Sequence, residues 1–237
     1  MNYASIIAKK EMRGYITSPA AYIVLVIFLL LGGWFFANPL FLNNQADMRG
    51  LFSLIPIIYL FFIPAITMGL LAKERNNGTI ELLTTLPIKD SDIIMGKFWA
   101  SLLLIGIGLL FTLIHVLTIV ILGKNIDYGS IFCGYLGLIF LGGVYSAIGI
   151  FSSSITSNQI VAFIISFFIV FFLFILQYSL LFIPGFLTGI FQYLSVSYHF
   201  SNISRGVIDT RNIIYFLSLI VVFLKLSQFA LSSRKWK

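Results

Sequence analysis

The side chains that could carry out acid–base, nucleophilic or metal chemistry are few in this chain of 237 residues: two histidines, eight carboxylates and one cysteine. His115 falls in an apolar segment and His199 in a different region, and neither stands in an HExxH pattern. No GxSxG motif is present, and the carboxylates lie in loops or at the ends of apolar segments. The sequence therefore predicts no catalytic residue and no cofactor or metal site, and we expect a chain that is not itself an enzyme.

Two isolated polar side chains inside apolar segments, His115 and Lys225, could serve an ion or substrate pathway. Each also has a simpler interpretation. His115 could be a hydrogen-bonded packing residue, and the stem of Lys225 is long enough to bring its ammonium group to the membrane surface. Both interpretations stay open for each residue.

A nucleotide site is not predicted either. The two Gly-Lys pairs, Gly96-Lys97 and Gly123-Lys124, lack the preceding glycine and the following serine or threonine of a Walker A motif. If ATP drives this protein, ATP and its Mg²⁺ bind to another polypeptide. The single cysteine, Cys133, excludes an internal disulfide and a cysteine metal cluster, and its apolar surroundings favour a packing role.

The most polar interruption of the apolar sequence is the stretch 73–87, KERNNGTIELLTTLP. At about 100° per residue, residues 80–86 separate into two faces of a short helix. Thr79 is expected to cap this helix, Gly78 to allow the sharp turn before it, and Pro87 to end it. Such a helix could dock a soluble partner, or it could only anchor the loop at the membrane surface. Its apolar face comprises Ile80, Leu82, Leu83 and Leu86, and its polar face comprises Glu81, Thr84 and Thr85.

The elements that position these residues follow from composition, because the chain is 59% hydrophobic and only 10% charged. A soluble fold of this composition would expose large apolar patches, so we expect one integral membrane domain over residues 1–237. The segments lack the alternation of barrel strands, and the predicted fold class is therefore all-α, with six transmembrane helices. Each predicted span has roughly the 20 apolar residues that a crossing helix needs; the spans are about 20–42, 51–72, 98–122, 131–151, 160–183 and 213–231.

The positive charges predict the orientation of these helices. Ten of the lysines and arginines, Lys97 among them, lie at the N-terminus, between the second and third spans, or after the sixth span, whereas four lie on the opposite face. By the positive-inside rule, both termini and the 73–97 loop are cytoplasmic. The net charge of +7 is explained by this topology without a continuous basic face, so no nucleic-acid partner is predicted.

Three further segments have a predicted role in the architecture. Residues 2–18 combine apolar and basic side chains, and they are expected to form either an interfacial helix at the inner membrane surface or a frayed tail. Residues 184–212 are too long for a turn and too apolar for a free loop, which indicates short helices dipping into the outer leaflet. Close helix packing, within one subunit or between two, is favoured by small residues of the fourth span: Gly134, Gly137, Gly142, Gly143 and Gly149.

The charged stretch resembles the E-(K/R)-x-x-G-T-x-E-x-L-L sequence of type-two ABC exporter permeases, a family that includes polysaccharide, drug and gliding-motility exporters. The order of the predicted elements along the whole chain is also similar to that of the family. The resemblance implies that the stretch is a coupling element placed against a cytosolic ATPase subunit, although Lys73 stands where an acid is also common. The residues that carry this implied role are Glu74, Arg75, Gly78, Thr79, Glu81, Leu82, Leu83, Leu86 and Pro87.

A second, narrower resemblance covers the outer region. This region is similar to the re-entrant segment of gliding-motility ABC permeases, and the matching residues include His199, Phe200, Arg205, Gly206 and Asp209. Together the resemblances imply a multi-pass subunit of an ATP-driven exporter in a bacterial inner membrane. Two such subunits, identical or different, would pack together within the lipid, and two ATPase subunits that bind ATP and Mg²⁺ would hold the 73–89 stretches.

Two other functions stay open at this point. An ion-coupled secondary transporter would need inverted repeats and helices broken near the middle of the membrane, and the sequence shows no repeat. A passive membrane scaffold for a surface machine is compatible with the resemblance to gliding-motility permeases. The spans rich in phenylalanine and leucine fit a lipid-linked or bulky amphiphilic substrate without identifying it.

Overall fold

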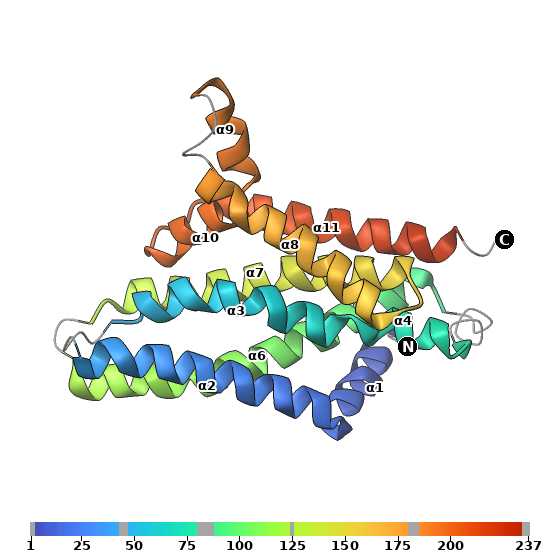
Figure 1. Ribbon diagram of the computed structural model, residues 1–237, viewed down its shortest axis with the longest axis horizontal. Coiled ribbons are helices and arrows are strands. Elements are labelled where there is room, and N and C mark those ends of the chain that lie inside the picture. Colours follow the sequence, from blue (N-terminus) through green and yellow to red (C-terminus); the bar gives the residue numbers. More distant parts are fainter. Residues whose placement is uncertain (1–2, 43–46, 80–87, 124–125, 180–184, 234–237) are drawn as a thin grey trace.

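The computed structural model describes residues 3–42, 47–79, 88–123, 126–179 and 185–233. Every regular element within these ranges is a helix (Figure 1). Six helical segments of the described part are long and apolar enough to cross a membrane, which confirms the predicted all-α class with six spans. They are α2 (Pro19–Leu42), α3 with α4 (Arg49–Asn76), α6 (Asp90–Leu122), α7 (Tyr128–Ile155), α8 (Gln159–Ser179) and α11 (Thr210–Ser232).

The helices define two ends of the molecule. α1 (Tyr3–Thr17) lies crosswise to the long helices, at the same end as α4 (Gly69–Asn76) and the last turns of α11 (Figure 1). We call this end the proximal end. The opposite end is called the distal end, and α3 (Arg49–Thr67), α7 and α11 begin there. An even number of spans requires α1 and the end of α11 to share one side, as they do here.

α7 is the central helix, and it contacts α3, α6, α8, α10 and α11. In its most apolar stretch 67% of the residues are buried, against 17% in α11. The glycines of α7 make this packing possible: a β-carbon on Gly134 would collide with Phe52, and one on Gly149 would collide with Thr67. Since these neighbours belong to the same chain, the structure assigns the small residues of the fourth span to packing within one subunit.

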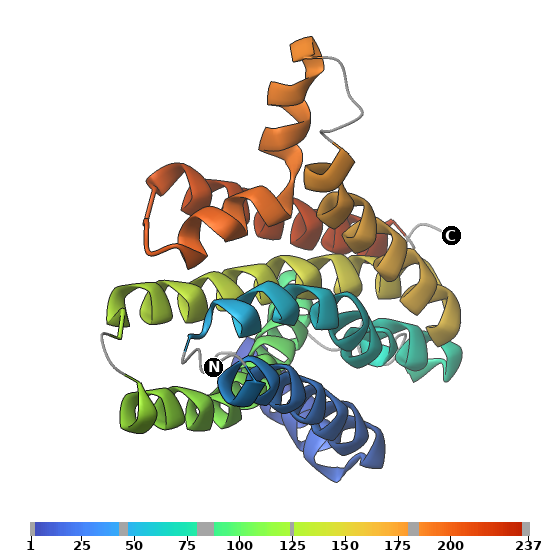
Figure 2. The ribbon, with the colours of Figure 1, turned by 60° about the vertical axis from the view of Figure 1, so that its left-hand side comes forward.

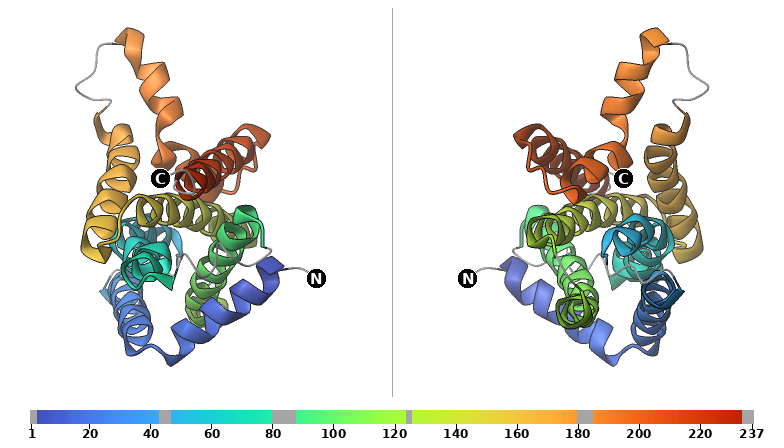
Figure 3. Two further views of the ribbon diagram at one scale, coloured as in Figure 1. Left: turned by 90° about the vertical axis from the view of Figure 1, so that its right-hand side faces the viewer. Right: turned by 90° about the vertical axis from the view of Figure 1, so that its left-hand side faces the viewer.

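The segment between α8 and α11 folds into two short helices. α9 (Gly185–Leu194) projects away from the long helices, as Figure 2 and Figure 3 show, and α10 (Val196–Ser204) returns against α7 and α8. Short helices are thus confirmed in this region, whereas their insertion into the outer leaflet stays a prediction. Gly206 has a φ of +91°, a left-handed conformation that glycine adopts without strain, and it allows the turn into α11.

Candidate functional site

A cluster of opposite charges lies at the proximal end, where α1, α4 and α6 meet. The ammonium group of Lys97 lies 2.9 Å from a carboxylate oxygen of Glu11 and 2.9 Å from one of Glu74. It also donates a hydrogen bond to the Leu70 carbonyl oxygen at 2.6 Å. Lys10 contributes a second cation, 3.3 Å from Glu74. The Lys97 side chain is only 1% exposed, and a buried ammonium group needs oppositely charged partners. Because these partners come from α1 and α4, the cluster ties three helices together.

Close packing of α1 on α6 brings these charges together. A β-carbon on Gly96 would lie 2.7 Å from Cβ of Ile7 and 2.8 Å from the carbonyl oxygen of Ala4, so α1 can sit here only because residue 96 is a glycine. Glu11 follows Ile7 by one helical turn and therefore lies on the same face of α1. The carboxylate is thereby presented to Lys97, the next residue of α6.

Lys97 does not lie in the loop predicted over 73–97 but within α6, where it is buried. α6 begins at Asp90, ahead of the membrane span predicted from about residue 98. Asp90 and Asp92 occupy the first turn of α6, where the helix dipole favours acidic side chains, so the polar sequence before the apolar run is helical as well. Lys97 therefore contributes to the interior of the proximal end and not to a basic loop.

The second span is interrupted between α3 and α4, and backbone groups at this break are hydrogen-bonded by a hydroxyl group of α7. The Ser153 hydroxyl accepts hydrogen bonds from the backbone N–H groups of Leu71 and Ala72 and donates one to the Met68 carbonyl oxygen, each at 2.9 Å. One hydroxyl offers one donor and two acceptor sites, and Ser153 uses all three. Backbone groups freed at a helix break inside a membrane protein need such partners. α4 is therefore joined to α7 at the position where it leaves α3.

The residues predicted to couple to an ATPase fall into two groups. Glu74 and Arg75 turn into the molecule: Glu74 pairs with Lys97, and Arg75 donates a hydrogen bond to the Ser154 carbonyl oxygen at 2.8 Å. Gly78 has a φ of +69°, which confirms the predicted sharp turn. Thr79 is exposed, and its hydroxyl donates to the Glu74 carbonyl oxygen at 3.0 Å. The predicted amphipathic helix, with Glu81, Leu82, Leu83, Leu86 and Pro87, lies outside the described residues.

Tyr15 connects α1 to the second span. Its hydroxyl donates a hydrogen bond to the Ile66 carbonyl oxygen at 2.8 Å, just before the break in the span. Burial, with an additional contribution from the Glu11 carboxylate, raises the pKa of Tyr15 well above its usual range. The hydroxyl therefore stays protonated and keeps donating at physiological pH.

The predicted residues of the outer region lie at and near the distal end. His199 is buried, its Nε2 donates to the Tyr193 carbonyl oxygen at 3.0 Å, and its Nδ1 lies 2.7 Å from Oδ1 of Asn212. The imidazole stacks on Tyr215, with ring centroids 3.9 Å apart. His199 thus joins α9, α10 and α11 as a structural residue.

The other residues of this region have separate positions. Phe200 packs over Gly137 of α7. The Asp209 carboxylate accepts a hydrogen bond from the backbone N–H of Arg211 at 2.8 Å and so caps α11. Arg205 follows α10, and its side chain is exposed.

The two isolated polar residues are also placed. The ring of His115 stacks on Phe36, with centroids 4.5 Å apart, and within the described part of the chain its Nε2 has no hydrogen-bond partner. This placement favours a packing role without the predicted hydrogen bond. Lys225 is exposed and lies beside Ser91 and Ile94 at the start of α6, and a pathway role for it stays untested. Cys133 is buried, which agrees with the packing role expected for it.

Sequence reasoning did not identify Glu11, Lys97 and Ser153 as site residues. Glu11 and Lys97 are 86 positions apart, and Ser153 and Met68 are 85 positions apart, so no local pattern connects either pair. The polar first turn of α6, with two acids, was the available indication that Lys97 is helical. Over the ranges that the structure describes, no group of three or more histidine, cysteine or acidic residues is arranged to hold a metal ion.

No curated protein gives a significant match to the chain. The family model described as ABC-2 family transporter protein matches residues 5–236, from within α1 to beyond the end of α11.

Proposed function

Because this chain belongs to the ABC-2 transporter family, we propose that it is an exporter permease driven by a separate cytosolic ATPase through α4 and the segment that follows it. Family membership makes it the membrane subunit of an ABC transporter, a transport subunit that is not itself catalytic. It also implies an ABC ATPase as a partner and another permease subunit. The ATPase supplies the bound ATP and Mg²⁺ in this proposal.

The attachment of α4 to its neighbours is the observation that supports the proposal best. Glu74 connects α4 to α6 and α1 through Lys97 and Lys10, and Arg75 and Ser153 connect it to α7. These contacts are ionic or made to backbone groups, and they converge on one short helix. A movement of the segment after α4 would therefore be transmitted to three other helices at once.

The remaining details of the proposal follow the resemblance and the charge distribution. We place the proximal end in the cytoplasm of a bacterium, with the chain in the inner membrane and α1 at its inner surface. Glu81 and the apolar face of Leu82, Leu83 and Leu86 are the proposed contact with the ATPase. A dimer of permease subunits, of the same or different sequence, and a gliding-motility type of exporter are also proposed on this basis.

Purification from native membranes tests the coupling. A tagged chain should retain a polypeptide with a Walker A motif, and Glu81→Lys should lower the amount retained about tenfold, which corresponds to ~1.4 kcal/mol. The matched control is Asp47→Lys, the same reversal of an exposed carboxylate at the distal end, which should leave the amount unchanged. If no ATPase is retained by the unmodified chain, or if both reversals have equal effects, the proposed coupling element is wrong.

A transport role is separated from a scaffold role by reconstitution. The purified complex in vesicles should hydrolyse ATP faster when extracts containing its substrate are added. Hydrolysis that no extract alters, in a complex that still assembles, would contradict export and favour a membrane scaffold.

A further inference from the structure

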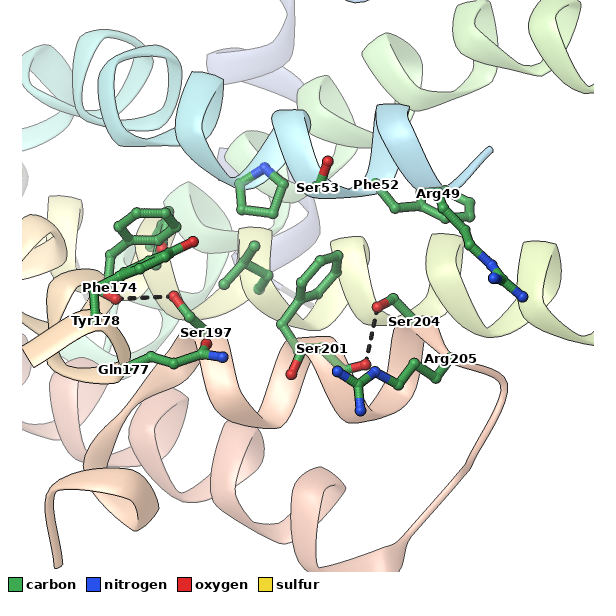
Figure 4. Close-up of a pocket in the computed structure, with 14 residues that line it drawn as sticks. Arg49, Phe52, Ser53, Phe174, Gln177, Tyr178, Ser197, Ser201, Ser204 and Arg205 are labelled. Carbon is green, nitrogen blue, oxygen red and sulfur yellow. Dashed lines mark hydrogen bonds between the residues drawn. The ribbon is translucent and has the colours of Figure 1, made fainter. Parts of the chain in front are cut away.

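A cavity of about 250 Å³ lies between α3, α7, α8 and α10 in the distal half of the molecule. Its volume is slightly below the range of roughly 300–1,000 Å³ typical of small-molecule sites. Figure 4 shows Arg49 and Arg205 at one end of the cavity and Phe174, Gln177 and Tyr178 at the other. The cavity is therefore divided into a cationic end and an aromatic end.

One of the two guanidinium groups at the cationic end, that of Arg205, has no carboxylate partner among the described residues. Arg49 has an exposed ion pair with Asp47, at 3.4 Å, and no ion pair of Arg205 is found within the described ranges. The other carboxylates of the distal end, Asp127 and Asp209, accept hydrogen bonds from the backbone at the starts of α7 and α11. A guanidinium group is suited to binding a phosphate or carboxylate through two parallel hydrogen bonds.

Hydroxyl groups line the cavity between its two ends. The hydroxyls of Ser53, Ser197 and Ser201 donate to the carbonyl oxygens of Gly50, Phe174 and Tyr198. Their oxygen lone pairs remain able to accept hydrogen bonds from hydroxyl groups of a ligand. The cavity thus suits a polar headgroup that carries hydroxyls.

A buried polar atom at the cavity gives an independent indication of a ligand. Tyr145 lines the cavity, its side chain is 0% exposed, and among the described residues its hydroxyl has no hydrogen-bond partner. A buried hydroxyl without a partner is unfavourable unless something else satisfies it.

We propose that this cavity binds the anionic, hydroxyl-bearing headgroup of an amphiphile, whose apolar part lies at the aromatic end. Arg49 and Arg205 pair with the anionic group, Tyr145 donates to the headgroup, and Phe174 and Tyr178 contact the apolar part. The site lies within one subunit and concerns the permease chain alone. Binding is therefore measured without the ATPase, and its failure is distinguishable from a failure of the proposed coupling.

Native mass spectrometry of the chain in a neutral detergent tests this site with phosphatidylglycerol, phosphatidylcholine and inorganic phosphate as probes. Phosphatidylglycerol should be retained, and phosphatidylcholine, which has no net charge, should be retained about tenfold less, a difference of the size expected for one charge-assisted contact. Inorganic phosphate in excess should not displace phosphatidylglycerol. Displacement by inorganic phosphate would overturn the proposal in favour of a site for free anions.

Two matched variants test whether phosphatidylglycerol binds in this cavity. Arg205→Gln should lower the retention of phosphatidylglycerol about tenfold, whereas Arg211→Gln should leave it unchanged, since Arg211 is also exposed at the distal end but does not line the cavity. Equal retention by both variants, or no preference for phosphatidylglycerol over phosphatidylcholine, would overturn the proposal.

Tyr145→Phe separates a ligand contact from a structural role. Removal of a hydroxyl that has no partner should leave the unfolding temperature of the lipid-free chain unchanged or raise it. The same change should lower phosphatidylglycerol retention several-fold, as the loss of one hydrogen bond predicts. A lower unfolding temperature with unchanged retention would show that the hydroxyl serves the fold and would contradict its role in binding.

Discussion

The two ends of the molecule use their carboxylates differently. At the proximal end, Glu11 and Glu74 pair with lysines, and the most buried of these, Lys97, is held by both. At the distal end, Asp127 and Asp209 accept hydrogen bonds from backbone N–H groups, and Arg205 remains exposed beside a cavity. Charges at the proximal end are therefore satisfied by other parts of the same chain. At the distal end Arg49 pairs only with the exposed Asp47, and Arg205, which has no ion pair within the described ranges, stays available to a ligand.

This difference separates two requirements of a transport subunit. A region that transmits movement needs contacts that hold several helices together, and the proximal cluster joins α1, α4 and α6. A region that binds a ligand needs polar groups that are positioned but not already neutralised. Net charge alone would not distinguish the two regions, because what differs is whether the cations are buried between carboxylates, as Lys97 is, or exposed, as Arg49 and Arg205 are.

Among the changes at either end, loss of Lys97, the buried lysine of the proximal end, should lower the stability of the chain most. Lys97→Met keeps the length of the side chain but leaves Glu11 and Glu74 with only the exposed Lys10 as a cation, so the free energy of unfolding should fall by about 3 kcal/mol. The measurement is unfolding of the purified chain by SDS in mixed micelles. Lys10→Met is the control, and because the Lys10 side chain is 62% exposed, it should cost less than about 1 kcal/mol. Equal losses would mean that the cluster is a surface feature.

A smaller loss of stability is expected when the hydrogen bonds of Ser153, also at the proximal end, are removed. Ser153→Ala leaves three backbone groups of the second span without their partner, and it should lower the free energy of unfolding by about 2 kcal/mol. In the control, Ser152→Ala, the lost hydroxyl donates only to the Ile148 carbonyl oxygen of its own helix, so the change should be at most about 0.5 kcal/mol. Both are read by the same SDS titration. A neutral Ser153→Ala would show that the charges alone hold α4.

The smallest loss of stability is expected at the distal end, where removal of the His199 hydrogen bonds tests whether they stabilise this region. His199→Phe keeps an aromatic ring against Tyr215 but removes the contacts to Tyr193 and Asn212, so the free energy of unfolding should fall by about 1 kcal/mol. The control is His115→Phe, which also replaces a histidine stacked on an aromatic ring, and it should be neutral because Nε2 of His115 has no partner within the described residues. If the two histidines respond alike to SDS, stacking rather than hydrogen bonding stabilises α10.

The six spans could be predicted from the sequence because each is a long apolar run, and hydropathy is a property of contiguous residues. The turn at Gly78 was predictable for the same reason, since it depends on local conformation. The burial of Lys97 could not be predicted. A cation next to an apolar run indicates a loop by the usual rule, and the carboxylates that change its environment come from Glu11, 86 positions away, and Glu74.

In the distal region, too, features that depend on neighbouring residues could be predicted, whereas contacts between distant parts of the chain could not. Its short helices were expected from composition, and Asp209 caps α11 within two residues of its own position. The pairing of His199 with Asn212 and the meeting of Arg49 with Arg205 at one cavity depend on how α3 and α10 pack on α7. The helix predicted over residues 80–86 lies outside the described residues and stays a prediction.

The connection through Ser153 is made to the backbone of the second span and not to its side chains. The hydroxyl bonds to the N–H groups of Leu71 and Ala72 and to the carbonyl oxygen of Met68, groups that every residue other than proline offers. Side-chain changes in α4 that preserve its packing would therefore leave this connection in place, whereas a change of Ser153 alone would remove it.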